Sequence, residues 1–148
     1  MFLTGNNGDD VNEYTLTTGF DVSTASFVDS FDISSQELGP RDLAFSADGT
    51  KMFVVGVLGD DVNEYTLSTA FDVSTSSFVD SFDISSQENS PTGLAFNNDG
   101  TKMFIAGNGG DDINEYTLTT GFDVSTASFV DSFDVSSQDT APNGLTFN

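Results

Sequence analysis

Residues 91–107 read Pro-Thr-Gly-Leu-Ala-Phe-Asn-Asn-Asp-Gly-Thr-Lys-Met-Phe-Ile-Ala-Gly. This stretch returns 51 residues earlier at 40–56, and its first part returns 51 residues later at 142–148. The whole chain divides by this period into repeats 1–51, 52–102 and 103–148, the last of which is shorter. Self-similarity at a fixed period of this size is typical of an array of structural units.

Each repeat contains four short runs that favour β-strands. In the middle of the chain these runs are Leu43 to Phe45, Met52 to Val55, Val62 to Leu67, and Phe78 to Ile84. Asp-Gly-Thr at 48–50 and again at 99–101 predicts a tight hairpin, because glycine tolerates the positive φ of such a turn. No stretch has a 3.6-residue apolar stripe, so helices are not expected.

The aromatic residues fall in six columns of the repeat, which predicts a packed core between units. In the fourth run, Phe78, Asp80, Phe82 and Ile84 alternate with Val79, Ser81 and Asp83. A two-residue period predicts a strand with one buried face.

The quoted stretch resembles the blade signature of NHL-like and YVTN-like β-propellers, in which Pro-x-Gly-Leu-Ala-Phe precedes Asp-Gly-Thr-Lys. The first copy departs from it, since Asp42 stands where the others have Gly93 and Gly144. The resemblance implies an all-β propeller with three four-stranded blades per chain. It also implies that the Gly-Leu-Ala-Phe strand is innermost. The chain would then supply strands B, C and D, two full blades, and one further inner strand.

Three blades are too few for a closed ring, since propellers have four to eight. The unpaired strands near Phe2 and near Phe147 are templates for pairing with another copy. We therefore expect the ring to be completed by oligomerisation. A homodimer with six blades is preferred, and a homotrimer with nine blades is the alternative.

Charge excludes several partners. There are 24 acidic residues against three basic ones, and the formal net charge is -21. Binding to nucleic acid or to an anionic membrane needs lysine and arginine, so neither partner is expected. No signal peptide or membrane span is recognised, and the location is left open, although the acidity suits an extracellular, saline medium.

The copies differ mainly in the loops at one end of the predicted blades, where a ligand would be sought, although exposed loops also drift without function. Arg41 is a candidate anchor for a carboxylate. The candidate binding residues are Asn6, Asn7, Arg41, Val57, Leu58, Glu88, Asn108 and Asp139.

Paired carboxylates beside glycine could help to hold Ca²⁺, although turn chemistry explains them more simply. No other cofactor is implied. The pairs are Asp9 and Asp10, Asp60 and Asp61, and Asp111 and Asp112.

The sequence favours a non-catalytic binding or scaffold module without enzymatic activity, because near-identical repeats and the absence of His and Cys make an asymmetric catalytic site hard to build. Two alternatives stay open. One is a propeller hydrolase similar to the propeller lactonases, and the other is a multivalent sugar-binding propeller.

Overall fold

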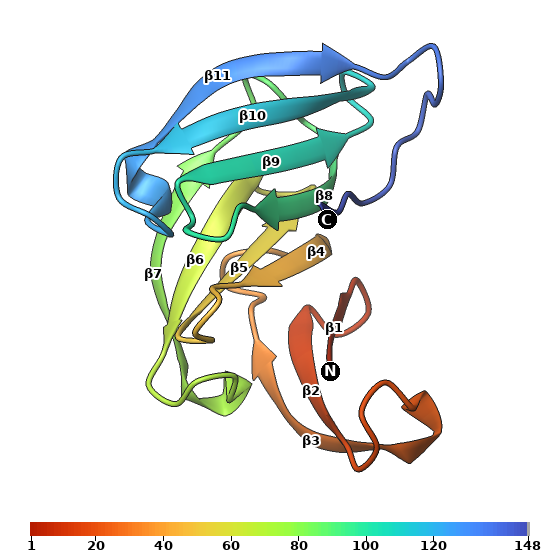
Figure 1. Cartoon of the computed structure of the whole chain (residues 1–148), viewed down its shortest axis with the longest axis vertical. Helices are drawn as coiled ribbons and strands as arrows, with labels where there is room; N and C mark the ends of the chain where they lie inside the picture. The colour runs from red at the N-terminus through yellow and green to blue at the C-terminus, as the bar shows by residue number, and fades with distance from the viewer. Residues whose placement is uncertain (148) are drawn as a thin grey trace.

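A computed structural model of the chain describes residues 1–147, and within them it is all-β. Eleven strands form three antiparallel sheets, and short 3-10 turns are the only helical elements of residues 1–147. The sheets fan out from one side of the molecule, where the two ends of the chain also lie (Figure 1). Within the same range, no helix has the length and apolar character needed to cross a membrane.

The first sheet has three strands, and the other two have four. Sheet one has the order β1-β2-β3, sheet two β4-β5-β6-β7, and sheet three β8-β9-β10-β11. In sheet one the strands are β1 Phe2–Gly5, β2 Asp10–Leu16 and β3 Ala25–Asp32. Sheet two has β4 Pro40–Phe45, β5 Lys51–Gly56, β6 Asp61–Leu67 and β7 Ser76–Asp83. Sheet three has β8 Pro91–Phe96, β9 Lys102–Gly107, β10 Asp112–Leu118 and β11 Ala127–Asp134, and the 3-10 turns are η1 Val22–Thr24, η2 Val73–Thr75 and η3 Val124–Thr126.

The predicted runs are confirmed as strands, except that the last run of the third repeat, within 142–147, forms no strand. The sheets are propeller blades, and the two four-stranded ones have the Leu-Ala-Phe strand at the inner edge. Each four-stranded blade takes its inner strand from one repeat and the other three from the next. In the predicted hairpin, Gly49 has φ +71°, and a Cβ there would lie 2.3 Å from the ring of Phe71. Only glycine fits this turn.

Neighbouring inner strands are held together by specific contacts. The Asp42 carboxylate on β4 accepts a hydrogen bond from the Leu94 N–H of β8 at 2.8 Å. On β8, the Thr92 hydroxyl donates to the Pro142 carbonyl at 2.6 Å. Residues 142–147 therefore lie beside β8 in the place of the next inner strand, and Asn148 of the predicted strand lies outside the described residues.

The alternation predicted for the fourth run is interrupted. The register between β6 and β7 shifts beside Tyr65, which pairs with Phe78, whereas Glu64 pairs with Asp80. Val79 is the extra residue of a β-bulge, so Phe78 and Phe82 point to opposite faces. Phe78 packs on Tyr65 of its own blade, and Phe82 packs on Tyr116 of the following blade.

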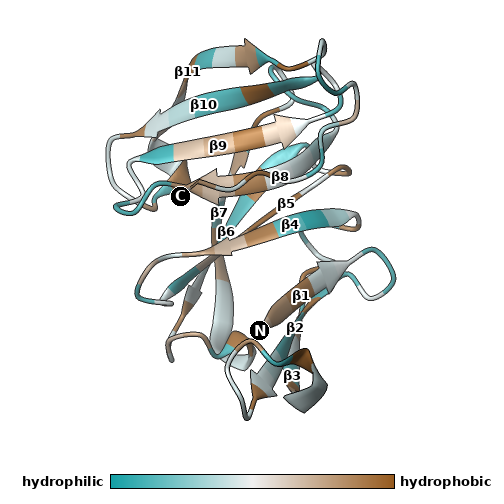
Figure 2. Cartoon of the chain, turned by 45° about the vertical axis from the view of Figure 1, so that its right-hand side comes forward, coloured by the Kyte–Doolittle hydropathy of each residue, from teal (hydrophilic) through white to brown (hydrophobic). Residues whose placement is uncertain are grey.

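Two hydrophobic clusters fill the spaces between the blades. One joins sheets one and two around Val11, Met52 and Tyr65, and the other joins sheets two and three around Phe53, Ile105 and Tyr116. In Figure 2, β9 is hydrophobic over most of its length. The aromatic prediction is only partly right, because one column of phenylalanines lies on the outer strands and is 44–58% exposed. Its members are Phe27, Phe78 and Phe129.

Candidate functional site

The candidate site is the loop end of the blades, where the turns after β5 and β9 meet the loops that lead into β4 and β8. The strand pairing sets its geometry. In sheet three, Pro91 pairs with Gly107, and Gly107 also pairs with Asp112. Neighbouring strands are about 4.8 Å apart, so an inner-strand residue and an aspartate of the third strand are separated by roughly 10 Å.

A β-bulge lies at the start of each inner strand. The register shifts between Pro40 and Asp42 and between Pro91 and Gly93, so Arg41 and Thr92 are the extra residues. Bulges turn a side chain away from the regular pleat and occur beside active sites. Because the third copy has Asn143 at this position, the three copies present different groups here.

Arg41 is exposed, and no salt bridge to it is found within residues 1–147. The two lysines are already paired, Lys51 with Glu64 and Lys102 with Glu115. A guanidinium without an acidic partner keeps its full capacity to bind a carboxylate or phosphate in a bidentate manner. Among the basic residues, Arg41 is therefore best suited to bind an anion.

Two buried glutamates fix the loops of this end. Glu37 is fully buried and accepts hydrogen bonds from the N–H groups of Gly39 at 2.6 Å and Leu58 at 3.2 Å. Glu88 does the same with Ser90 at 2.6 Å and Gly109 at 2.8 Å. These carboxylates hold each loop against the neighbouring turn, so the bulge residues rest on a rigid frame.

The aspartate pairs have separate structural roles. The first member of each pair has a positive φ of 48–52°, and its carbonyl accepts the N–H of the residue that follows the outer strand, as Asp60 does from Ile84 at 2.9 Å. The second member begins β2, β6 or β10, and its carboxylate accepts a side-chain amide N–H, as Asp61 does from Asn63 at 2.6 Å. Turn chemistry thus accounts for the Gly-Asp-Asp pattern.

Asp61 also has an altered acidity. Burial raises its pKa, and the negative charges of Glu37 and Asp83 raise it further. Burial likewise raises the pKa of Asp112. A half-buried carboxylate with a raised pKa is better suited to take up a proton than a solvated one, which makes Asp61 the candidate general base of this end.

Most of the predicted binding residues are exposed at this end, and their role in binding stays a prediction. Asn6, Asn7, Leu58, Asn108 and Asp139 are exposed, and Val57 is half-buried. Glu88 is the exception, since it is 1% exposed and engaged with backbone N–H groups. Among residues 1–147, no three or more His, Cys, Asp or Glu side chains converge well enough to hold a metal ion.

Sequence reasoning missed the roles of Glu37, Asp42 and Thr92. Burial of a glutamate leaves no mark in a single sequence that is rich in acidic residues. The bulge had a readable signal, since Arg41, Thr92 and Asn143 are the one inner-strand position at which all three copies differ.

No family model matches the sequence, and no curated protein matches it. Solved structures do resemble the fold. They include a candidate 6-phosphogluconolactonase from Bacteroides fragilis, with 16% identity, a TM-score of 0.63, and coverage of 90% of this chain and 35% of that one. The periplasmic gluconolactonase of Pseudomonas aeruginosa has 16% identity and a TM-score of 0.59, with coverage of 90% and 35%. Virginiamycin B lyase from Staphylococcus aureus has 17% identity and a TM-score of 0.61, with coverage of 99% and 41%.

These similarities establish the β-propeller fold, and this chain spans only about a third to two fifths of the structures it matches. They also correct one expectation. The preference for a non-catalytic binding or scaffold module without enzymatic activity is contradicted, because two of these three structures bear the names of lactonases. Repeated blades do not exclude an asymmetric site, because the residue at the bulge position differs between the copies.

Proposed function

We propose that the chain is part of a propeller hydrolase that opens the lactone ring of an anionic sugar derivative at the loop end of the blades. The observation that carries the proposal is Arg41, an exposed guanidinium on an inner-strand bulge in a chain with a net charge of -21. The lactonase names of structures with this fold support it as well.

The chemistry assigns one step to each of two side chains. Arg41 binds the phosphate or carboxylate of the substrate and holds it against repulsion by the acidic surface. Asp61 takes a proton from a water molecule, whose oxygen attacks the lactone carbonyl carbon. When the tetrahedral intermediate collapses, the ring C–O bond breaks and its oxygen receives that proton. The product is an open-chain hydroxy acid.

We also propose that the working unit is a homodimer with a six-bladed ring, because propellers close with four to eight blades around a central channel and closure pairs the free strand edges. A homotrimer with nine blades is the alternative. The extracellular setting suggested by the acidic composition stays a prediction.

The experiment is lactone hydrolysis followed with a pH indicator, using glucono-lactone with and without a 6-phosphate. We expect a rate above that of buffer alone. Arg41→Ala should raise KM for the phosphorylated lactone by roughly 10–100-fold, since a hydrogen bond to a charged group contributes about 1.5–3 kcal/mol. The unphosphorylated lactone should be affected much less.

Asp61→Asn should lower kcat by about 10²–10⁴-fold, the usual contribution of a general base. Asp10→Asn is the matched control, because Asp10 has the same place and the same amide contact in the first sheet, which has no arginine on an inner strand. Equal rates with and without the assembled protein, for both lactones, would exclude this function.

A further inference from the structure

One residue of each blade has the same sequence context and a very different exposure. Val73 and Val124, at the starts of η2 and η3, are fully buried. Val22, at the start of η1, is 72% exposed. The buried valines pack between their own blade and the preceding one, where η3 contacts β7 and η2 contacts β3. Val22 is thus an exposed hydrophobic side chain, and no blade within residues 1–147 covers it.

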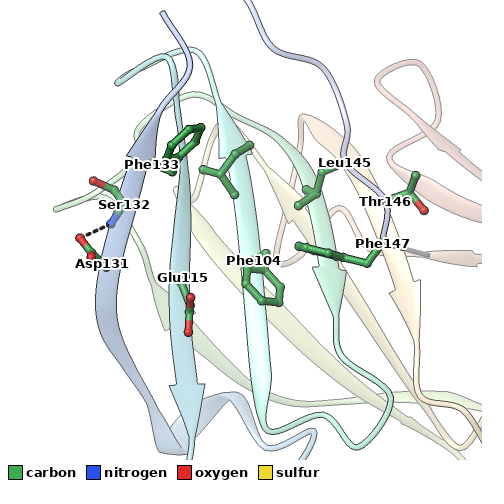
Figure 3. A pocket seen from close by; sticks show the side chains of 9 residues that line it. Phe104, Glu115, Asp131, Ser132, Phe133, Leu145, Thr146 and Phe147 are labelled. Atoms are coloured by element: carbon green, nitrogen blue, oxygen red, sulfur yellow. Dashed lines mark hydrogen bonds between the residues drawn. The ribbon is translucent and has the colours of Figure 1, made fainter.

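A hollow that corresponds to the surroundings of the buried valines lies on sheet three, at the other end of the series of sheets. It has a volume of about 470 Å³ and lies on the outer face of sheet three, beside the segment 145–147 (Figure 3). Phe104, Ile113, Glu115, Phe133 and Phe147 line it. Their counterparts one repeat earlier, which include Phe53, Val62 and Phe96, form the cluster that encloses Val124.

The phenylalanine clusters between blades also indicate that sheet three lacks a neighbour. Two clusters of three phenylalanines join successive blades, and in both the first two rings have centroids 4.4–4.5 Å apart. A third pair, Phe104 and Phe147, has the same separation of 4.5 Å and no third ring within residues 1–147. The unused counterpart is Phe20, which is fully exposed. The complete clusters are Phe2, Phe45 and Phe71, and Phe53, Phe96 and Phe122.

Polar contacts repeat in the same way. Glu13 accepts a hydrogen bond from the Val73 N–H at 3.1 Å, and Glu64 accepts one from the Val124 N–H at 3.0 Å. The third member of the series is Glu115, which lines the hollow and is 31% exposed. In the first repeat, the N–H group that corresponds to those of Val73 and Val124 is that of Val22.

We propose that the outer face of sheet three binds sheet one of a second copy of this chain. Val22 of that copy enters the hollow, its Phe20 completes the cluster of Phe104 and Phe147, and its Val22 N–H donates to Glu115. The new contact continues, with the same residue types, two interfaces that already exist inside the chain.

The segment 142–147 then supplies the fourth strand that sheet one lacks. Leu43 pairs with Val54, and Leu94 pairs with Ile105, in the two complete blades. The same register places Leu145 opposite Leu3 of the second copy. Two exposed edges are thereby satisfied at once, because an unpaired strand edge favours pairing with another chain.

This inference gives the residues of the ring contact assumed in the proposed function, and it does not depend on hydrolysis. Its first test is molecular mass by sedimentation in high salt, which screens the repulsion between two acidic copies. The wild-type chain should be a closed oligomer. Val22→Asp should weaken association at least 100-fold, because it places a carboxylate in an apolar hollow.

Val28→Asp is the matched control. Val28, Val79 and Val130 are 49–50% exposed in all three blades, so this position faces solvent and not a neighbouring blade. The same charge change there should leave the mass unchanged. A wild-type monomer at micromolar concentration would overturn the proposal and leave the face to a different partner. Unaltered association of Val22→Asp would overturn it too.

The second test examines the register with the double variant Leu3→Cys and Leu145→Cys, in a chain that has no native cysteine. Directly opposed strand residues lie within disulfide reach. Oxidation should give a covalent dimer or trimer on a non-reducing gel, and the size identifies the ring. Each single variant is the control and should stay unlinked. No link in the double variant would overturn the proposed pairing, whereas an assembled ring without lactonase activity would contradict the hydrolase alone.

Discussion

Glu64 accepts a hydrogen bond from the backbone N–H of Val124 at 3.0 Å, although the two residues are 60 positions apart in the sequence. The glutamate is 2% exposed and also pairs with Lys51 at 2.6 Å. One buried carboxylate therefore joins two blades and neutralises a lysine whose ammonium group also donates to the Phe122 carbonyl.

Glu64→Ala should reduce the free energy of unfolding by about 1–3 kcal/mol, because the buried N–H of Val124 would be left without an acceptor. Glu115→Ala removes the same residue from the open face, where its pair with Lys102 is half-exposed. We expect this control to change the unfolding free energy of the monomer by no more than about 1 kcal/mol. Urea denaturation of both variants at low protein concentration makes the comparison, and equal losses would contradict the blade-joining role of Glu64.

Glu88→Gln should destabilise the loop end by roughly 2–3 kcal/mol. The carboxylate accepts hydrogen bonds from the N–H groups of Ser90 and Gly109, and an amide accepts them more weakly while adding an NH₂ that has no acceptor there. Asp139→Asn, at the equivalent exposed position, should stay within about 0.5 kcal/mol of the wild type. Thermal unfolding measures both. A smaller loss for Glu88→Gln than for Asp139→Asn would be incompatible with this account.

Asp61→Asn should make the protein more stable at neutral pH. Its pKa is raised in the folded state, so the native protein binds the proton more tightly, and stability falls as pH rises from the unfolded pKa through the folded one. Asparagine avoids that loss. The gain should vanish below the unfolded pKa of about 3.9, where Asp61 is protonated in both states. Urea midpoints measured across this pH range give the profile.

Asp83→Asn should behave in the opposite way, and it serves as the comparison. Hydrogen bonds from Ser85 lower the pKa of Asp83, so its charged form stabilises the native state above the unfolded pKa. This variant should lose stability at neutral pH, and the loss should disappear as pH falls through the lowered pKa. Profiles of the same sign for both variants would show that local hydrogen bonding and burial do not govern these two carboxylates.

Gly100→Ala should cost about 1–3 kcal/mol, because Gly100 has φ +70° and a Cβ there would lie 2.3 Å from the ring of Phe122. Gly5→Ala is the control, since nothing lies within 4 Å of its Cβ position. A fluorescence-detected denaturation curve for each variant is sufficient. Equal stability of the two alanine variants would contradict the close packing of this hairpin against Phe122.

The sequence predicted the strands because these depend on local patterns that recur in the repeats. The inner position of the Leu-Ala-Phe strand followed from the resemblance to known propellers. It did not predict the bulge at Val79, since a bulge depends on how two strands pair and not on alternation within one strand. The burial of Glu37 and Glu88 was missed for a similar reason. Their partners are backbone N–H groups of a turn about 20 residues away, and backbone groups carry no sequence signal.

The candidate site was predicted only in part. The loop end and Arg41 followed from differences between the copies, whereas the placement of Asp61 two strands away from the inner-strand bulge requires the sheet register. Near-identity of the repeats does not by itself exclude an asymmetric site. A single position with different residues in the three copies makes the blades inequivalent, even when the residues around it are the same.

The bulge at Val79 has a consequence for how such a gene changes length. Because it leaves Phe82 on the face that meets Tyr116 of the following blade, while Tyr65 meets Phe31 of the preceding one, the middle blade carries both halves of the same junction. One repeat of 51 residues is encoded by 153 nucleotides, three for each residue. Recombination that adds or deletes one such unit can therefore change the number of repeats without creating a new kind of contact between successive blades.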